Sequence, residues 1–361
     1  MPQPSRNAQT EQTNDGAETR MSNSGPENRS LALWELADLV TPMAVRVAAT
    51  YRVADHIAVG RVTAMEIARA EELHAGALER VLRHLVTVGV LTLGGGTYGL
   101  TGLGEQLRSD HPGGQHRLVD LGGALGRGDL SLAELAHVVR TGEPAYPVRY
   151  GLPYWEDLAA DRALAESFDA IMADNLARDV PSIAAAYDWS ALGHVYDLGG
   201  GSGVLLGGLL AAHPALRGTV VDLKATAARA ADRFRALGLS DRAEVVDGSF
   251  FDELPAGGGG YILSSVLHNW SDDDALRILG RCADAVADGG RVLVIEETGE
   301  HPETAMDLRM LAYFAGVERG VDDLARLAAR AGLKLTGVFE AGSQAAGVRS
   351  VLELVPEDGA H

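Results

Sequence analysis

A glycine-rich run at residues 195–203 is the part of the sequence best suited to chemistry. It reads Val-Tyr-Asp-Leu-Gly-Gly-Gly-Ser-Gly, and the next apolar stretch ends at Asp222. Glycines let the backbone approach a ligand closely, and an acid about 20 residues downstream is placed to accept hydrogen bonds from both hydroxyls of a ribose. The pattern therefore predicts a nucleoside-bearing cofactor, although such turns also occur in nicotinamide and flavin enzymes.

Polar residues close several predicted strands and form a second set of candidates. From Val195 onward the pattern alternates strand and helix, with strands predicted at 195–198, 218–223, 243–246, 261–264 and 291–295 and a final strand pair at 333–339 and 349–354. Alternation of this kind gives an α/β, Rossmann-like sheet that is mostly parallel and covered on both faces. Ligands bind at the carboxyl ends of such strands. That edge is expected to carry Asp197, Asp222, Ser249, Ser264 and Glu296.

Two residues after the third strand suit an adenine ring. Phe250 could stack on its face, and Ser249 could form a hydrogen bond with its edge. The full set of expected cofactor contacts is Asp197, Gly199, Gly201, Asp222, Leu223, Ser249, Phe250 and Ser264.

His268 lies in the run Ser-Ser-Val-Leu-His-Asn-Trp-Ser-Asp-Asp-Asp, just after the fourth strand. Imidazole titrates near neutrality, so this side chain could accept a proton from a phenol. A single histidine is more often structural, but its place beside the cofactor edge favours function. Such a base needs an orienting acid, and Glu296 and Glu318 are both candidates, with Glu297 as a competitor of Glu296. Any one of these acids could instead form a surface ion pair.

Large apolar residues near these positions could line a substrate pocket. Asn269 and Trp270 follow the histidine directly, and Trp155, Phe168 and Met172 lie in a predicted helical stretch at 155–187. Simple core packing would explain the last three equally well.

The N-terminal half has the pattern of a winged helix. An apolar helical segment at 31–59 is followed by a short helix with Thr63 and Glu66 as its capping box, a helix at 75–88 and a hairpin at 91–101. A second helical stretch at 118–139 leads to a turn-rich connector that begins Gly-Glu-Pro-Ala-Tyr-Pro at 142–147.

Winged helices often bind DNA, and the helix at 75–88 would present Arg80, Arg83 and His84 to a groove. The same helix carries Glu79, and the net charge of −19 repels nucleic-acid phosphate and anionic membranes alike. A scaffold that pairs with its own copy in a dimer is the favoured interpretation.

The length and composition of the chain exclude several other classes of protein. A length of 361 residues suggests two domains, and the single cysteine, Cys282, excludes a disulfide within the chain and favours a reducing, cytoplasmic compartment. No apolar run is long enough to span a membrane. No metal-ligand spacing, nucleophile elbow or phosphate-binding loop of the Walker type occurs, so we expect no metal and no hydrolase or P-loop chemistry.

Two motifs together resemble the S-adenosylmethionine-dependent small-molecule O-methyltransferases, which include plant caffeate and hydroxyindole methyltransferases. They are Asp-Leu-Gly-Gly-Gly-Ser-Gly at 197–203 and Leu-His-Asn-Trp-Ser-Asp at 267–272. The segments at 187–190, 216–219 and 307–311 are similar to the actinobacterial polyketide-tailoring branch of that family, which includes anthracycline and mitomycin methyltransferases. The resemblance extends over roughly residues 31–355.

The resemblance implies a class I methyltransferase domain with an N-terminal, mostly helical winged-helix dimerisation domain. The expected boundaries are a disordered tail at 1–29, the dimerisation domain at 30–115, a helical linker and pocket wall at 116–190, and the catalytic domain at 191–361. The expected partners are a small aromatic substrate and a second copy of the chain, with neither nucleic acid nor membrane.

The resemblance also assigns roles to residues that match the family motifs. Gly199 would lie against the methionine part of the cofactor, and Asp222 would bind the ribose. Ser249 and Phe250 would hold the adenine, although plant members have Asp where Ser249 stands. Plant members likewise have Lys where Ser264 stands.

His268 matches the general base of the family, and Glu296 and Glu318 match the acids that flank it. The implied reaction is methyl transfer from S-adenosyl-L-methionine to a hydroxyl, favoured as phenolic, of an aromatic polyketide-type natural product, which leaves S-adenosyl-L-homocysteine. The alternative is a relative that hydroxylates or decarboxylates a similar substrate, and retention of His268 favours methyl transfer. A ligand-sensing regulator is disfavoured by the acidic charge, and a nicotinamide dehydrogenase by the absence of a GxGxxG spacing.

Overall fold

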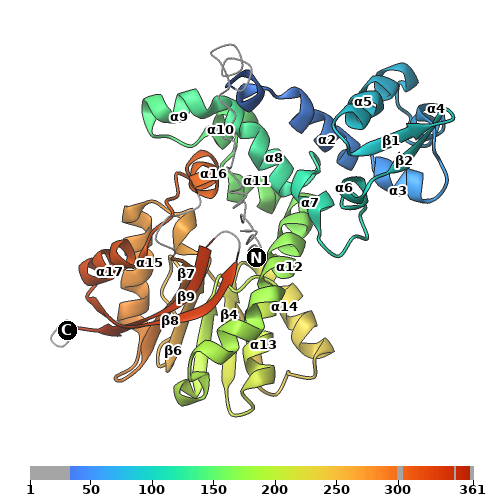
Figure 1. The fold of residues 1–361 in the computed structure, drawn as a ribbon. Coiled ribbons are helices and arrows are strands. Elements are labelled where there is room, and N and C mark those ends of the chain that lie inside the picture. Colours follow the sequence, from blue (N-terminus) through green and yellow to red (C-terminus); the bar gives the residue numbers. More distant parts are fainter. Residues whose placement is uncertain (1–32, 299–303, 345–346, 358–361) are drawn as a thin grey trace, which may run out of the picture. The chain divides into compact units, whose positions relative to one another are not determined.

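The computed structural model describes residues 33–298, 304–344 and 347–357. The chain forms two compact units, one reaching to Met43 and the other beginning at Ala44. In the first unit, residues 33–37 are helical and exposed. All the predicted site residues belong to the second unit, whose helices and strands are labelled in Figure 1. The tail predicted at 1–29 lies outside the described residues.

The winged-helix pattern is present. Its elements are α2 (Val40–Thr50), α3 (Val53–Ala58), α4 (Ala64–Ala70), α5 (Ala75–Thr87), β1 (Leu91–Gly94) and β2 (Thr97–Leu100). The capping box of α4 is confirmed, because the Thr63 hydroxyl accepts the Glu66 N–H at 3.3 Å and the Glu66 carboxylate accepts the Thr63 N–H at 3.0 Å. The helices and the hairpin share one apolar core, to which α5 contributes Leu78, Leu82 and Leu85.

The single helical segment predicted at 31–59 is wrong. The chain reverses after Thr50, and Arg52 adopts a left-handed backbone with φ 48° before α3 begins. The break lets residues on both sides, such as Ala49 and Val53, face the same core. The apolar side chains near the start of this segment are exposed, namely Leu33, Leu36, Leu39 and Val40.

The middle of the chain forms helices, but they are shorter and more numerous than predicted. It contains α6 (Gly102–Glu105), α7 (Gln115–Val119), α8 (Ala124–Ser131), α9 (Leu135–Thr141), α10 (Ala145–Tyr150), α11 (Tyr154–Ala160) and α12 (Arg162–Ala186). The turn-rich connector predicted at 142–147 is wrong, because α10 begins inside it. Pro144 precedes the helix with an extended backbone and Pro147 lies in its first turn, where a proline removes no intrahelical hydrogen bond. Tyr146 anchors this helix in the core.

The C-terminal half is the predicted Rossmann-like sheet. Its strands are β3 (His194–Leu198), β4 (Arg217–Asp222), β5 (Ala243–Asp247), β6 (Gly260–Ser264), β7 (Arg291–Glu297), β8 (Leu333–Gln344) and β9 (Gly347–Pro356). Their order is β5-β4-β3-β6-β7-β9-β8, with β9 antiparallel to both neighbours and the other pairings parallel. All seven predicted strands are therefore present.

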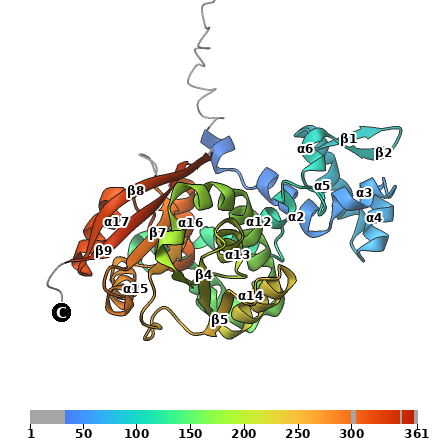
Figure 2. The same cartoon turned by 90° about the horizontal axis from the view of Figure 1, so that it is seen from below.

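Helices cover both faces of this sheet (Figures 1 and 2). One face packs against α12, α13 (Val204–Ala212) and α14 (Lys224–Ala236), and the other against α15 (Asp272–Ala285) and α17 (Val321–Arg330). Strands buried on both sides contain continuous apolar runs, as Tyr261–Leu263 of β6 and Val292–Ile295 of β7 show.

The strand order creates a switch point between β3 and β6. From β3 the chain passes to β4 and β5 on one side and then returns to β6 on the other side. A crevice forms outside the carboxyl ends of the strands where the direction of winding reverses, and ligands bind there in folds of this type. The glycine turn after β3 and the His268 loop after β6 therefore flank one crevice.

One helix near the site was not predicted. α16 (Thr304–Phe314) lies between β7 and α17, and it packs against α8. The contact is close, because a Cβ on Gly128 would lie 2.7 Å from the ring of Tyr313. Only a glycine on α8 allows this approach.

Asp129 on α8 links three helices through its carboxylate. It accepts hydrogen bonds from Arg46 on α2, from Arg309 on α16 at 2.8 Å, and from the Tyr313 hydroxyl. Burial alone would raise the pKa of Asp129, but these donors outweigh it and hold the pKa below its usual range. The winged segment, α8 and α16 thus share one buried ionic contact.

Asp129→Ala should lower the free energy of unfolding by about 3 kcal/mol, because it removes the carboxylate that pairs with the half-buried Arg46 guanidinium. Asp174→Ala is the matched control, since Asp174 forms a mostly exposed ion pair with Arg117, and its cost should stay below about 1 kcal/mol. Denaturant titration measures both values. Equal costs for the two variants would contradict a structural role for the Asp129 cluster.

Candidate active site

Three loops meet at the switch point, and Gly199 lies at their contact. Gly199 has φ +68°, and a Cβ there would lie 3.2 Å from Phe250 in the loop after β5 and 3.3 Å from Val266 in the loop after β6. Both the left-handed backbone and the lack of space require glycine at this position. The residues that the sequence assigned to three separate strand ends are thus brought together.

Asp222 closes the glycine turn from the neighbouring strand. Its Oδ2 accepts the Gly201 N–H at 2.9 Å, and its Oδ1 accepts the Leu223 N–H at 2.7 Å. Each carboxylate oxygen keeps a further lone pair, which suits the two hydroxyls of a ribose. Burial raises the pKa of Asp222, and the two N–H groups oppose that shift. The Leu223 side chain beside it is 56% exposed, so an apolar surface adjoins the acid.

Asp197 and Ser264 are buried polar groups whose hydrogen bonding is incomplete. Neither the oxygens of Asp197 nor Oγ of Ser264 has a well-formed hydrogen bond within the described residues. Burial, together with the Asp222 charge, raises the pKa of Asp197 to about 7. A Cβ on Gly200 would lie 2.6 Å from the Asp197 carboxyl, which places this side chain directly beneath the glycine turn. Unsatisfied polar atoms beside a glycine cradle fit a polar ligand such as the S-adenosylmethionine expected here.

Ser249 and Phe250 form the third side of the crevice. The Ser249 hydroxyl accepts the Phe251 N–H at 3.2 Å, which fixes the start of this loop. Trp270 packs edge-on against Phe250 and Phe251, with ring centroids 5.8 and 4.8 Å apart. Trp270 therefore packs on the loop after β5, whereas Trp155 packs against Phe168 and Phe314.

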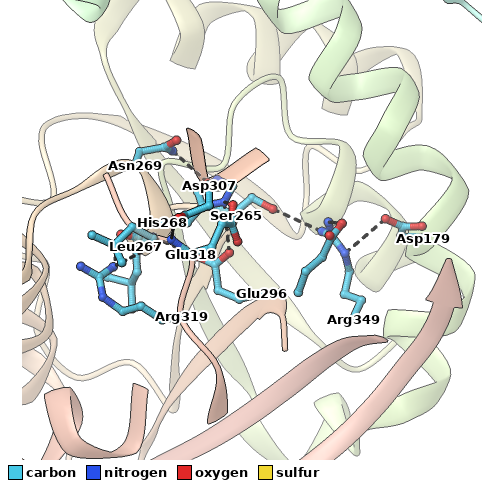
Figure 3. Close-up of polar contacts among 12 residues, drawn as sticks. Asp179, Ser265, Leu267, His268, Asn269, Glu296, Asp307, Glu318, Arg319 and Arg349 are labelled. Atoms are coloured by element: carbon cyan, nitrogen blue, oxygen red, sulfur yellow. Dashed lines mark hydrogen bonds and ion pairs between the residues drawn. The ribbon is translucent and has the colours of Figure 1, made fainter. Parts of the chain in front are cut away.

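His268 lies on a short 3-10 turn, Leu267–Asn269, between two buried glutamates (Figure 3). Its Nδ1 is 3.0 Å from Glu318 Oε1 and 3.8 Å from Glu296 Oε2. Glu296 uses its other oxygen to accept the Leu267 N–H at 3.0 Å. Glu318 is thus the hydrogen-bond partner of the ring, whereas Glu296 holds the backbone beside it.

The charges around His268 set its titration. Burial lowers the pKa of His268, but the carboxylates of Glu296 and Glu318 outweigh burial and the opposing charge of Arg349, so the net pKa is raised. Burial raises the pKa of Glu296, and the imidazole opposes that shift. The site therefore stabilises the protonated imidazole, which is the form that a base reaches after accepting a proton.

Glu297, the competitor considered from the sequence, is directed elsewhere. It accepts a hydrogen bond from Arg349 at 3.2 Å. Arg349 also donates to the Ser265 hydroxyl at 3.2 Å and pairs with Asp179 on α12 at 3.4 Å (Figure 3).

The His268 loop has a constrained backbone. Ser265 is left-handed, with φ 53°, and its carbonyl accepts a hydrogen bond from the Asn269 side chain at 3.2 Å. The Val317 N–H donates to the His268 carbonyl at 3.0 Å. A Cβ on Gly316 would overlap that same carbonyl. Asn269, predicted to line the pocket, thus helps to hold its own loop.

Aromatic side chains gather between α11, α12 and α16. Trp155 stacks on Phe314 with centroids 5.0 Å apart and meets Phe168 edge-on at 5.2 Å. Met172 is half-buried and lies one turn further along α12. The indole N–H of Trp155 is buried without a hydrogen-bond partner among the described residues. Phe314 was not among the predicted residues, although it directly precedes the segment that carries Glu318.

Other features of the described residues bear on the class of site. They include no group of three or more His, Cys, Asp or Glu side chains arranged to hold a metal ion. No helix in these ranges is both long and apolar enough to cross a membrane. A separate hollow, lined by Tyr187, Arg291 and Glu353 among others, lies at the amino end of the strands and contains none of the predicted site residues.

A Rossmann-like sheet with a glycine turn, an acid at the end of the neighbouring strand and a part-buried histidine–glutamate pair is typical of a cofactor-dependent transferase. The chain matches the O-methyltransferase domain family over residues 132–334 and the O-methyltransferase dimerisation domain over residues 34–110. It belongs to the S-adenosylmethionine-dependent O-methyltransferases, which confirms the resemblance, the fold class and the cofactor expected from the sequence.

Two similar proteins come from Streptomyces species. The chain is 59% identical to 2,7-dihydroxy-5-methyl-1-naphthoate 7-O-methyltransferase of Streptomyces carzinostaticus, over 86% of this chain and 94% of the relative. It is 46% identical to aclacinomycin 10-hydroxylase of Streptomyces purpurascens, over 88% of this chain and 87% of the relative.

The chain also resembles a solved O-methyltransferase structure. The chain is similar to an O-methyltransferase from neocarzinostatin biosynthesis in complex with S-adenosyl-L-homocysteine and 1,4-dihydroxy-2-naphthoic acid. The TM-score is 0.86 at 56% identity, covering 90% of this chain and 98% of the other.

Gly199→Ala should weaken binding of S-adenosyl-L-homocysteine about tenfold or more, since a strained backbone and displaced Phe250 and Val266 side chains together cost at least about 1.4 kcal/mol. Calorimetric titration measures the dissociation constant. Gly238→Ala is the matched control, because Gly238 also has a positive φ, +68°, but a Cβ there would meet nothing within 4 Å. Equal affinity in both variants would argue against a cofactor site at the Gly199 turn.

Proposed function

We propose that this enzyme transfers a methyl group to a phenolic hydroxyl of a flat aromatic polyketide, of the substituted naphthoate class, with His268 as general base. The observation that supports this role is the part-buried hydrogen bond between His268 Nδ1 and Glu318 at 3.0 Å, at the crevice that Gly199 borders. The 59% identity to a naphthoate O-methyltransferase supports the substrate class.

The proton transfer follows from the geometry of the ring. Glu318 accepts a hydrogen bond from Nδ1–H, so the proton of the neutral imidazole stays on Nδ1. Nε2 is then the unprotonated nitrogen, and it accepts the proton of the substrate hydroxyl. Glu318 and Glu296 then stabilise the imidazolium. Bound S-adenosylmethionine supplies a methyl group already activated on a sulfonium, so the protein's remaining task is to position the acceptor and take its proton.

Cofactor binding is assigned to the residues around the glycine turn. Asp222 holds the ribose, Phe250 and Ser249 border the adenine, and Asp197 and Ser264 offer unsatisfied polar groups to the methionine part. Exposed Leu223 covers the outer edge of the nucleoside.

The substrate is assigned to the aromatic cluster of Trp155, Phe168 and Phe314, with Met172 beside it. Stacked and edge-on rings suit a flat polycycle. The buried indole N–H of Trp155 offers a hydrogen bond to a polar substituent on such a ring.

We also propose the domain boundaries, the homodimer and the cellular location that the sequence predicts. Residues 30–115 form the homodimer, 116–190 wall the pocket, and 191–361 bind the cofactor, in an enzyme of antibiotic biosynthesis that works in the cytoplasm. The dimerisation-domain match at 34–110 supports the homodimer. The other boundaries and the cytoplasmic location stay predictions.

Hydroxylation is the second candidate, because aclacinomycin 10-hydroxylase is 46% identical to this chain. The imidazole paired with Glu318 favours methylation, since attack of a hydroxyl on the methyl carbon releases a proton that must be accepted. Mass spectrometry of the product separates the reactions, because methylation adds one CH₂ whereas hydroxylation adds one oxygen and decarboxylation removes carbon dioxide.

His268→Ala should lower kcat by about 10²–10⁴-fold, the usual contribution of a positioned base, while the affinity for S-adenosyl-L-homocysteine stays unchanged. Steady-state assays with a dihydroxynaphthoate acceptor measure the first value and calorimetry the second. His194→Ala serves as the control, because His194 lies at the amino end of β3 and pairs with Thr219, and its kcat should match the wild type. A His268→Ala enzyme with wild-type kcat would remove this residue from the mechanism.

The acid limb of the kcat profile should have its midpoint above 6.5, the ordinary pKa of histidine, because the reaction needs neutral imidazole and the carboxylates raise the pKa of His268. Glu318→Gln removes one of those charges, so the pKa should fall and the limb should move to lower pH, while kcat on the plateau decreases about tenfold or more as ring orientation is lost. Glu340→Gln is the control and should leave the midpoint in place, because Glu340 is an exposed residue of β8 and is not among the groups that shift the pKa of His268. A midpoint unchanged by Glu318→Gln would contradict the assignment of Glu318.

A further inference from the structure

Arg319 follows Glu318 directly and is only 5% exposed. Its guanidinium donates to the Leu267 carbonyl at 2.8 Å, to the Trp270 carbonyl at 2.9 Å and to the Val317 carbonyl at 3.3 Å. Nε and Nη2 both donate to Asp272 Oδ1, at 3.1 and 2.7 Å. One side chain thus spans the loop on both sides of His268.

Burying a guanidinium is costly unless its donors are satisfied. Here the Leu267 and Trp270 carbonyls come from the residue before the histidine and the second residue after it, so the 3-10 turn that presents the imidazole closes around the Arg319 fork (Figure 3). Asp272, at the first residue of α15, supplies the countercharge and ties the fork to a rigid helix.

We propose that Arg319 is a positioning residue for methyl transfer, which fixes the His268 loop so that the ring meets Glu318. This inference rests on the proposed function of His268 as the base. Because Glu318 and Arg319 are consecutive, a single segment holds both the imidazole and the backbone that carries it. The Glu318 N–H in turn donates to Asp307 Oδ1 on α16 at 3.0 Å, so that segment is itself anchored.

The chemistry of the contact requires arginine. A guanidinium has five N–H donors in a rigid plane and can bridge two carbonyls and a carboxylate at once. A lysine ammonium would keep the charge opposite Asp272 but lacks the planar fork. Lysine should therefore preserve folding better than it preserves the position of His268.

The charged groups that face His268 come from several elements. Glu296 lies on β7, Glu318 precedes α17, and Arg349 lies on β9. Arg319 and Asp272 form their own pair on the backbone side of the loop. A change in the pH profile of an Arg319 variant would thus report an altered contact between the ring and its carboxylates.

The test compares Arg319→Lys and Arg319→Gln with Arg326→Lys, since Arg326 forms an exposed ion pair with Asp323 on α17. Expected for Arg319→Lys are a kcat about 10–100-fold lower, an unchanged KM for S-adenosylmethionine, and an acid limb moved to lower pH. Arg319→Gln should show the same kinetic changes with a larger loss of Tm. Arg326→Lys should resemble the wild type in every measurement.

A double-mutant cycle separates positioning from a purely structural role. In a Glu318→Gln background, Arg319→Lys should move the pH midpoint little further, because the contact that it maintains has already been removed. Wild-type kcat and midpoint in Arg319→Lys, or a further midpoint shift of equal size in the double variant, would overturn the proposal.

Two further outcomes remain decisive. If neither Arg319 variant folds, Asp272→Asn weakens the same fork from a side chain that is 63% exposed, and an unchanged pH midpoint there would overturn the proposal. If His268→Ala keeps wild-type kcat, the proposed role of His268 as the base fails. If His268→Ala loses activity while the Arg319 variants behave like the wild type, only the positioning role of Arg319 is refuted.

Discussion

The structure of this site depends on one ionic hydrogen bond, between the imidazole of His268 and the carboxylate of Glu318. An imidazole buried without a countercharge would resist protonation and make a poor base. Two carboxylates reverse that tendency, and only one of them is close enough for a hydrogen bond. The distances indicate a different role for each carboxylate. Glu318 fixes the tautomer of the imidazole, whereas Glu296 adds negative charge and anchors the backbone at Leu267.

The sheet makes this bond possible by bringing distant segments to one edge. The residues involved come from the end of β7, the loop after β6 and the loop after α16. Two of these loops contain a non-glycine residue with positive φ, Ser265 at 53° and Ala315 at 59°. Such conformations cost about 1–3 kcal/mol each and persist only where surrounding contacts enforce them. Both strained residues lie within three positions of the residues they present, His268 and Glu318.

The sequence alone predicted the strands of the sheet correctly, because they depend on local patterns. Buried parallel strands are continuous apolar runs, and a glycine turn with a downstream acid has a fixed spacing. The same patterns placed Asp222 and His268 at the crevice. The short helices were harder: α10 starts between two prolines that indicate a turn, and its stability comes from the burial of Tyr146, a tertiary effect.

The residues near the site that the sequence did not predict were missed for a common reason. Phe314 and Arg319 act through contacts with segments about 50 to 160 residues away in the chain, so no local period marks them. The only signal for Arg319 was a cation directly after a candidate acid. From the sequence, neither Glu296 nor Glu318 could be preferred as the partner of His268, because that choice depends on a difference of less than 1 Å between two distances.

The unpredicted helix α16 connects the parts of the molecule that must act together. At its start Asp307 accepts the Glu318 N–H, and at its end Phe314 stacks on Trp155 in the aromatic cluster. Between them, Arg309 and Tyr313 bind the buried Asp129, which also holds Arg46 of the winged segment. A shift of α16 would therefore change the orientation of the base, the wall of the pocket and the contact with the dimerisation domain at once. If the substrate binds at the aromatic cluster, as proposed, it would pack against the same helix that secures Glu318, and acceptor binding would then help to order His268.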